Sequence, residues 1–471
     1  MVKRLNTIDY GDTIRPGFNG AADIITTGNI TAGLYFGDGG NLSNISGGGG
    51  GGSDTLSNVV DRGNTTSNTV QFTNSDVSLL ATGPIKFSQD IRLETNSSDD
   101  SIRIGNTAGA GTLGIRTVSI GSFSAINAGD HSIGIGTSAG RVDQGDYSIA
   151  IGHYSGGGGA LQGDYAIAIG DEAGRFSQNN NAVAIGQDAG KEYQGLNSVA
   201  IGAGTGQITQ RNRAVAIGNN AGQTSQNDYA VSIGYNAGAL YQCSSAVAIG
   251  ASAGNQDQNN YAVSIGEQAG QVNQGSSAVA VGYRAGNLFQ KQHAVAIGQD
   301  AGSEEQNSYA IAMGYQAGQT VQDYDAVAIG NNAGKTSQGY ISVAIGKNAG
   351  SFSQSGENVA IGSNAGAISQ GLNCVAIGAY AGNKNQNNYA VAIGDQAGET
   401  GQNAYSIAIG YNAGLTGQHT RSIVLNANSS SLNTTQSDSF FVKPIRRVTD
   451  NTGLQQLYYD TSTSEIVYYE P

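Results

Sequence analysis

The hydrophobic pattern of this chain is a short alternation that repeats many times. The segment Ala214–Gln226 (AVAIGNNAGQTSQ) recurs with small changes through most of the chain. Within it, Val215 and Ile217 alternate with Ala214 and Ala216, a period of two that is typical of β-strands. The unit is too short for a pair of helices, and glycine at two fixed positions would break them. The pattern therefore predicts an all-β fold.

Three positions define the repeat, represented by Gly218, Gly222 and Gln226. The first glycine recurs every 16 residues from Gly170 to Gly410, and two earlier copies are offset by a two-residue slip at 156–159. All 18 copies keep the second glycine and the glutamine. A repeat of this kind indicates an architecture of stacked units.

Each 16-residue unit predicts one coil of a parallel β-solenoid with two short strands and a glycine corner between them. Coils stack at about 4.8 Å per rung, so 18 rungs give a rod of roughly 86 Å. No proline occurs between Pro84 and Pro444, as expected because proline cannot donate to such a ladder. We expect Val, Ile and the alanine before the second glycine to fill the core.

The opposite face of the first strand has alanine at almost every rung. A stripe about 10 Å wide along the rod would expose roughly 800 Å² of apolar surface, more than monomers usually leave in one patch. This predicts a homo-oligomer with solenoids packed side by side through their alanines. The predicted face includes Ala214, Ala216, Ala294, Ala296, Ala390 and Ala392.

The conserved spacing of the glutamine allows two interpretations. It could be an idle polar corner residue, or each glutamine could bond to the next rung as stacked amides do in cross-β arrays. Its retention in every copy, while its neighbours vary, favours the amide ladder.

Composition and charge narrow the function classes. The chain has 471 residues, 73 of them Gly, with no Trp and only 12% charged residues. Its net charge of −13 argues against nucleic acid or an anionic membrane as the main partner.

The N-terminus lacks the apolar region of a secretory signal, and no apolar stretch is long enough to span a membrane. Cys243 and Cys374 are expected to be free thiols, which fits assembly in a reducing compartment.

The sequence offers little for catalysis or ligation. The four histidines show no shared repeat phase and no metal-ligand spacing, and the acidic residues do not follow a calcium-binding repeat. Gly109–Gly114 matches G-x-G-x-x-G, but no βαβ unit surrounds it and chance matches are expected among so many glycines. We therefore expect no enzyme activity, cofactor or metal. The histidines are His131, His153, His293 and His419.

Tyrosine recurs at two positions of the repeat, either five residues before the first glycine, as in Tyr147 and Tyr229, or just after it, as in Tyr235. These rings could cap corners and cover neighbouring rungs, or together with Asn and Gln they could form a sugar- or protein-binding surface. Their spread along the whole array favours the structural role.

The units of the form Ala-Val-Ala-Ile-Gly-x-x-Ala-Gly resemble the head repeats of YadA-type trimeric autotransporter adhesins. The resemblance covers about residues 101–426 and implies a left-handed parallel β-roll, three chains around one axis, with Val and Ile filling each roll. Two departures are the more regular spacing with its glutamine, and the lack of that family's signal peptide and membrane anchor.

The flanking segments predict further divisions. Residues 1–46 form an attachment segment, 47–53 a glycine-rich linker, 54–100 a β-rich shaft, 101–426 the array and 427–471 a C-terminal tip or cap. Stretches 28–45 and 55–66 resemble modules of phage and large-virus fibre proteins. Aromatic runs at 440–446 and 457–469 around a polar turn predict a β-hairpin. Whether a C-terminal trimerisation chaperone was removed stays open.

These features predict a structural virion fibre or spike, assembled in the host cytoplasm. It would be a homotrimeric rod that is fixed to a capsid or tail protein by its N-terminal segment and that attaches to an unknown receptor or glycan. The alternative is a cellular surface adhesin of the trimeric autotransporter type. An ice-binding solenoid is disfavoured because threonine is irregular in the rungs.

Overall fold

The computed structural model describes residues 100–468, except residue 106 and the ranges 158–160 and 450–453. The chain divides into two units, 1–91 and 92–471, and every described residue belongs to the second. The predicted attachment segment, the linker and the shaft up to residue 99 lie outside the described residues.

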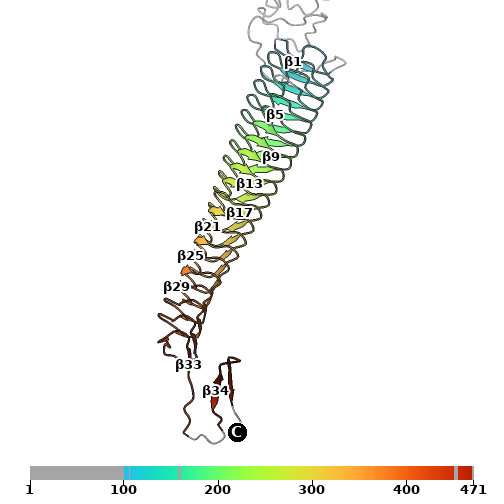
Figure 1. Ribbon diagram of the computed structural model, residues 1–471. Coiled ribbons are helices and arrows are strands. Elements are labelled where there is room, and N and C mark those ends of the chain that lie inside the picture. Colours follow the sequence, from blue (N-terminus) through green and yellow to red (C-terminus); the bar gives the residue numbers. More distant parts are fainter. Residues whose placement is uncertain (1–99, 106, 158–160, 450–453, 469–471) are drawn as a thin grey trace, which may run out of the picture. The chain divides into compact units, whose positions relative to one another are not determined.

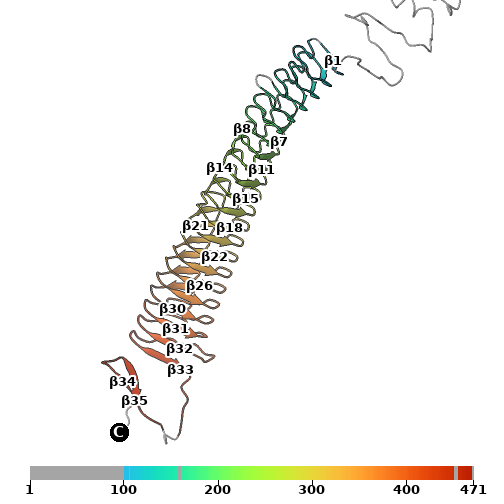
Figure 2. The ribbon, with the colours of Figure 1, turned by 90° about the vertical axis from the view of Figure 1, so that its right-hand side faces the viewer.

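The second unit is a parallel β-solenoid, and its described residues contain no helix (Figure 1). Its first sheet has 22 parallel strands, one in each successive coil. Figure 2 shows these strands stacked along the axis of the solenoid. The strands are β1 (Ile102–Ile104), β2 (Val118–Ile120), β3 (Ile133–Ile135), β4 (Ile149–Ile151), β5 (Ile167–Ile169), β6 (Val183–Ile185), β7 (Val199–Ile201), β9 (Val215–Ile217), β11 (Val231–Ile233), β13 (Val247–Ile249), β15 (Val263–Ile265), β17 (Val279–Val281), β18 (Val295–Ile297), β20 (Ile311–Met313), β22 (Val327–Ile329), β24 (Val343–Ile345), β26 (Val359–Ile361), β28 (Val375–Ile377), β30 (Val391–Ile393), β31 (Ile407–Gly410), β32 (Ile423–Asn426) and β33 (Phe440–Lys443).

The second side of the coils forms two shorter parallel sheets, each of whose strands ends at the repeated glutamine. The first contains β8 (Ile208–Gln210), β10 (Thr224–Gln226), β12 (Leu240–Gln242), β14 (Gln256–Gln258) and β16 (Val272–Gln274). The other contains β19 (Glu304–Gln306), β21 (Thr320–Gln322), β23 (Thr336–Gln338), β25 (Phe352–Gln354), β27 (Ile368–Gln370) and β29 (Lys384–Gln386). Before Ile208 this side has only isolated bridges between successive glutamines.

The pairing register gives a coil spacing of about 16 residues, since Val215 pairs with Val231. At the predicted slip Ile149 pairs with Ile167, so the two extra residues are absorbed within one coil and the register is kept. Backbone N–H groups donate from coil to coil throughout, for example from Val215 to the Ala230 carbonyl at 2.9 Å. This ladder satisfies the backbone of strands that are only three or four residues long.

The interior of the solenoid is filled by alanine and glutamine. In one coil Ala214, Ala216, Ala221 and Gln226 are all fully buried within the single chain. The predicted exposed alanine face is therefore wrong: all six of its members, Ala214, Ala216, Ala294, Ala296, Ala390 and Ala392, have 0% exposure. Val and Ile, predicted to fill the core, lie on the outside.

Side-chain size explains this inversion. A period of two separates the two faces of a strand but does not say which one is inside. The interior position of the first-sheet strands is Ala in most coils, and elsewhere mainly Gly or Ser, as in Gly134 and Ser232. Larger residues appear there only at the two ends of the stack, Arg103 in the first coil and Val424 and Phe441 in the last two. A narrow coil that also encloses a glutamine has no room for Val or Ile.

The corners depend on left-handed backbone conformations and close contacts. Gly218 has φ of 120°, and a Cβ there would lie 2.8 Å from the carbonyl oxygen of Gly234 in the next coil. Gly222 has φ of 52°, and a Cβ there would lie 2.7 Å from the Oε1 atom of Gln226. The first glycine therefore allows coils to approach each other, and the second makes space for the buried glutamine.

The C-terminal end of the solenoid extends beyond the predicted boundary at residue 426. β33 pairs in parallel with β32, and Leu432 and Phe441 pack against the end of the alanine core. The run Phe440–Lys443 is therefore a strand of the stack, and its predicted pairing with residues 457–469 in a hairpin is wrong. A hairpin does form in the C-terminal segment, from β34 (Leu457–Asp460) and β35 (Glu465–Tyr468), which pair antiparallel.

The second glycine can be tested with a matched pair of substitutions. Gly302 and Gly417 have φ of 50° and 59°, so alanine suffers similar backbone strain at both sites. At Gly302 the new Cβ would lie 2.7 Å from the side chain of Gln306, whereas at Gly417 nothing lies within 4 Å. We expect Gly302→Ala to cost about 1–3 kcal/mol more than Gly417→Ala, measured by chemical unfolding. Equal losses would contradict the packing role.

Candidate functional site

The repeated glutamines form an amide ladder inside the solenoid, so the ladder interpretation is confirmed. Gln226 Nε2 donates to Gln242 Oε1 at 3.0 Å, and Gln242 Nε2 donates to Gln258 Oε1 at 3.0 Å. Each amide also crosses the coil: Gln226 Nε2 lies 2.9 Å from the Val215 carbonyl oxygen. Each glutamine therefore links its own two strands and the next coil, which satisfies a buried polar group.

Interior serines join the same network. Where serine replaces alanine in β11 and β15, Ser232 Oγ donates to Gln242 Oε1 at 2.6 Å and Ser264 Oγ donates to Gln274 Oε1 at 2.7 Å. A serine hydroxyl is therefore tolerated in the interior, because a glutamine Oε1 of the ladder accepts its hydrogen bond.

The ladder is interrupted at three coil-to-coil steps, where the side-chain bond to the next glutamine is missing. The steps follow Gln144, Gln338 and Gln402. The Oε1 atoms of the next glutamines, Gln162, Gln354 and Gln418, are buried without a hydrogen-bond partner, as is Oε1 of the first glutamine, Gln144. The first break coincides with the two-residue slip.

The outer surface of the first sheet is a continuous aliphatic stripe. We define it as the first and third residues of the first-sheet strands from β2 to β31, all of which are Val, Ile or Met. Nine of its third-position side chains are 36–39% exposed in the single chain, and Ile217, Ile297 and Ile329 are each 37% exposed. An apolar strip that runs through 19 consecutive strands is typical of a surface that another protein covers.

Aromatic rings line one corner of the coils. The rings of His131, Tyr147 and Tyr165 stack in consecutive coils, with centroids 4.7 and 5.0 Å apart and planes within 5° of parallel. Tyr389 and Tyr405 stack at 5.0 Å in the same way. Since each stacked ring covers the face of its neighbour, these contacts support the structural role over sugar stacking.

The histidines are not brought together. His131 and His293 occupy the same corner position as the tyrosines, and His293 stacks on Tyr309 at 5.0 Å. The absence of a shared repeat phase predicted for the four histidines is therefore wrong for this pair. His153 Nδ1 lies 3.0 Å from Asp171, and His419 Nδ1 lies 2.8 Å from Thr434.

A small ionic cluster lies at one corner. Lys191 Nζ lies 2.7 Å from Glu172 and 3.0 Å from Asp188. The hydrogen bond to Lys191 lowers the pKa of Glu172, with Arg175 contributing to the same shift. The pKa of Lys191 is raised, first by Glu172 and then by Asp188. These reciprocal shifts indicate an ion-pair network between coils.

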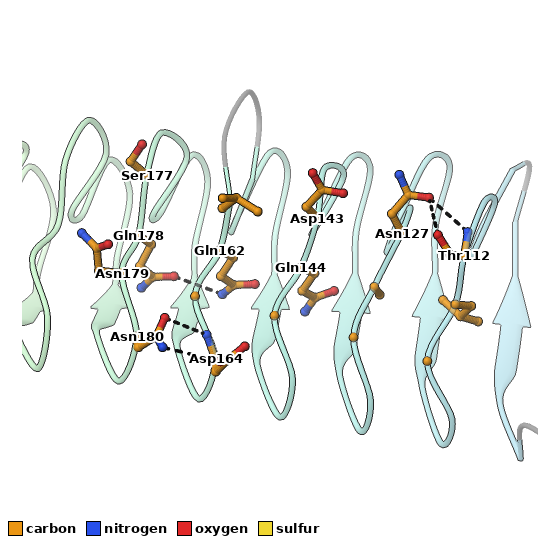
Figure 3. A pocket seen from close by; sticks show the side chains of 17 residues that line it. Thr112, Asn127, Asp143, Gln144, Gln162, Asp164, Ser177, Gln178, Asn179 and Asn180 are labelled. Atoms are coloured by element: carbon orange, nitrogen blue, oxygen red, sulfur yellow. Dashed lines mark hydrogen bonds between the residues drawn. The ribbon is translucent and has the colours of Figure 1, made fainter.

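A polar groove lies on the second side of the coils near the start of the array, where β8 and its successors are not yet formed (Figure 3). It has a volume of about 760 Å³. Asn127, Asp143 and Ser177 line one wall and Asp164 and Asn180 the other, as Figure 3 shows. Gly129, Gly145 and Gly163, which occupy equivalent positions in three successive coils, also line it.

The described part of the chain holds no group of three or more His, Cys, Asp or Glu residues suited to a metal ion. Over the same residues, no helix has the length and apolar character needed to cross a bilayer. Both cysteines are free thiols, and burial raises the pKa of the Cys374 thiol. Comparison with known protein families, characterised proteins and solved structures finds no match to this chain.

The ladder can be tested within a single strand. Gln258 is fully buried in the ladder, whereas Gln256, two residues earlier in β14, is exposed. We expect Gln258→Ala to lower stability by about 1–3 kcal/mol, because it removes the hydrogen bonds of Gln258 with Gln242, Gln274 and the Val247 carbonyl. Gln256→Ala should have little effect. Thermal unfolding followed by circular dichroism measures both, and equal melting temperatures would refute the ladder's contribution.

Proposed function

We propose that this chain is a structural fibre or spike protein of a virion, in which three copies form a rod that projects from the particle and mediates attachment. The observation that supports this most directly is the continuous aliphatic stripe. A chain with this surface is suited to permanent assembly with copies of itself, and the resulting rod is suited to a mechanical and adhesive role.

The stripe identifies the surface through which the copies would pack. Each coil presents two aliphatic side chains at the same height along the axis, so the stripes of neighbouring chains match rung by rung. Obligate interfaces of this kind resemble a domain core cut in half. The predicted self-association is therefore proposed to occur through the Val and Ile side chains of the stripe, because the alanine face is buried inside each coil.

A trimer of left-handed coils is proposed on the resemblance of the repeats to YadA-type heads. Such an assembly would bury three stripes around a common axis and leave the second side of each chain outward. The exposed second side would then be available for attachment to a host-surface receptor or glycan.

The virion assignment draws on sequence features. Stretches 28–45 and 55–66, which resemble virus fibre modules, precede the array, and the thiols are free, which suits assembly in host cytoplasm. The N-terminal segment would bind a capsid or tail protein, and no enzyme activity is proposed.

A cellular surface adhesin of the trimeric autotransporter type is the alternative, favoured by the repeats themselves. Detection of the chain in purified virus particles would support the first, and detection only on cell surfaces the second.

The assembly can be tested by charge substitutions on the stripe. We expect the full chain to be a trimer by light scattering after size exclusion, and Ile297→Lys with Ile329→Lys to give a folded monomer. Both side chains point outward, so the coils should persist, whereas lysines buried between chains would be unpaired charges.

Thr336→Lys is the control for this experiment. Thr336 lies in β23 on the second side, and β29 naturally has Lys384 at the equivalent position, so this variant should remain a trimer. A wild-type monomer or dimer, or a double variant that stays trimeric, would contradict the proposed interface.

A further inference from the structure

We propose that the polar groove binds a neutral oligosaccharide chain laid along the axis of the solenoid. This inference deepens the proposed attachment function by naming a ligand class and a site for it. The groove is an open depression that extends over successive coils between Thr112 and Asn180.

The groups that line the groove suit hydroxyl-rich ligands. The side chains of Asp143 and Ser177 point outward and form no hydrogen bond within the described part of the chain (Figure 3). Asn127 accepts hydrogen bonds through Oδ1 from the backbone N–H and hydroxyl of Thr112, which leaves its amide nitrogen directed away from Thr112. A carboxylate, a hydroxyl and an amide together offer both acceptors and donors, as sugar hydroxyls require.

Apolar contacts are available beside these polar groups. Leu161 lies in the same row as Asp143 and Ser177 and is 63% exposed, and Leu113 also lines the groove. A sugar ring has polar edges and a C–H face, so a groove with interspersed leucines and hydrogen-bonding groups matches both parts of it.

The repeat of the groove favours a polymer over a small molecule. Asn127, Asp143, Leu161 and Ser177 occupy equivalent outward positions in four successive coils, one rung of about 4.8 Å apart. A pyranose unit within a chain is of comparable length, so successive sugar units would meet equivalent positions in successive coils.

Charge and backbone pairing disfavour two other classes of ligand. The groove has no Lys, Arg or His in its lining, and its carboxylates Asp143 and Asp164 would repel anionic polymers. Peptides that add a strand need an unpaired edge. Here the N–H groups of Gly129, Gly145 and Gly163 already donate to the next coil at 2.7, 2.8 and 2.7 Å.

The groove and the aliphatic stripe lie on different sides of the coils. The groove is formed by the second side, near the repeated glutamines, whereas the stripe belongs to the first sheet. Packing through the stripe therefore leaves the groove open, and a site built within one chain does not need the trimer. The two proposals can consequently fail independently.

The test uses the full chain with maltohexaose, cellohexaose and N-acetylchitohexaose as neutral probes and a heparin hexasaccharide as the anionic one. Saturation-transfer NMR is expected to detect binding of at least one neutral probe to the chain and no binding of the heparin hexasaccharide. Ser177→Tyr should abolish this signal by filling the groove, and the array naturally has Tyr241 at the equivalent position, so the coil should fold. Ser225→Tyr, at the same position outside the groove, is the matched control and should bind normally.

A second pair of variants tests the hydrogen bonding. Asp143→Ala should raise the dissociation constant for the neutral probe about ten-fold, as expected for loss of a hydrogen bond to a charged group. Asp257→Ala, at the equivalent position of a later coil, should leave the dissociation constant unchanged.

Oligosaccharide binding by a monomeric chain would still support the groove, even if the proposed trimer is not found. No signal from any neutral probe, preferential binding of heparin, or equal binding by Ser177→Tyr would overturn the proposal.

Discussion

The structure depends on the close stacking of narrow coils around an interior that has room only for small side chains and one amide. Each glutamine bridges the two sides of its coil and, at most steps, bonds to the glutamine above, as Gln226 does with Val215 and Gln242. Gly218 and Gly222 make this possible, because a methyl group at either place would meet the next coil or the glutamine itself. Backbone hydrogen bonds between coils complete the network. The fold therefore relies on repeated polar contacts as well as on hydrophobic burial.

This interior determines what the surface must be. An alanine core buries little apolar area per coil, so each coil is stable only within the stack. The larger aliphatic side chains lie outside, where Val, Ile and Met remain partly exposed along the first sheet. Burial of this stripe against sister chains would supply the hydrophobic stabilisation that the single-chain core lacks. Folding and assembly of the proposed rod would then be coupled through one surface.

The second side of the coils is less uniform and is the place where variation is tolerated. Its outward residues range from Thr224 to Phe352 and Lys384 without change in the backbone register. Near the start of the array, glycines in three successive coils line a polar groove, whereas later coils form regular strands there. A rigid repeated scaffold with a variable outer face can alter what it binds without disturbing its core.

The sequence by itself determined the repeat, the parallel solenoid, the glycine corners and the glutamine ladder, because strict spacing in every copy reflects contacts that recur in every coil. It misplaced the two faces of the first strand, since alternation is symmetric and hydrophobicity favours Val and Ile inside. The restriction of the inner position to small residues such as Ala216, Gly134 and Ser232 was the available signal. The continuation of the sheet through Phe440–Lys443 and the groove near Asp143 were also decided by tertiary structure. Both arise from coils that depart from the repeat, and how such coils pack follows from contacts between neighbouring coils.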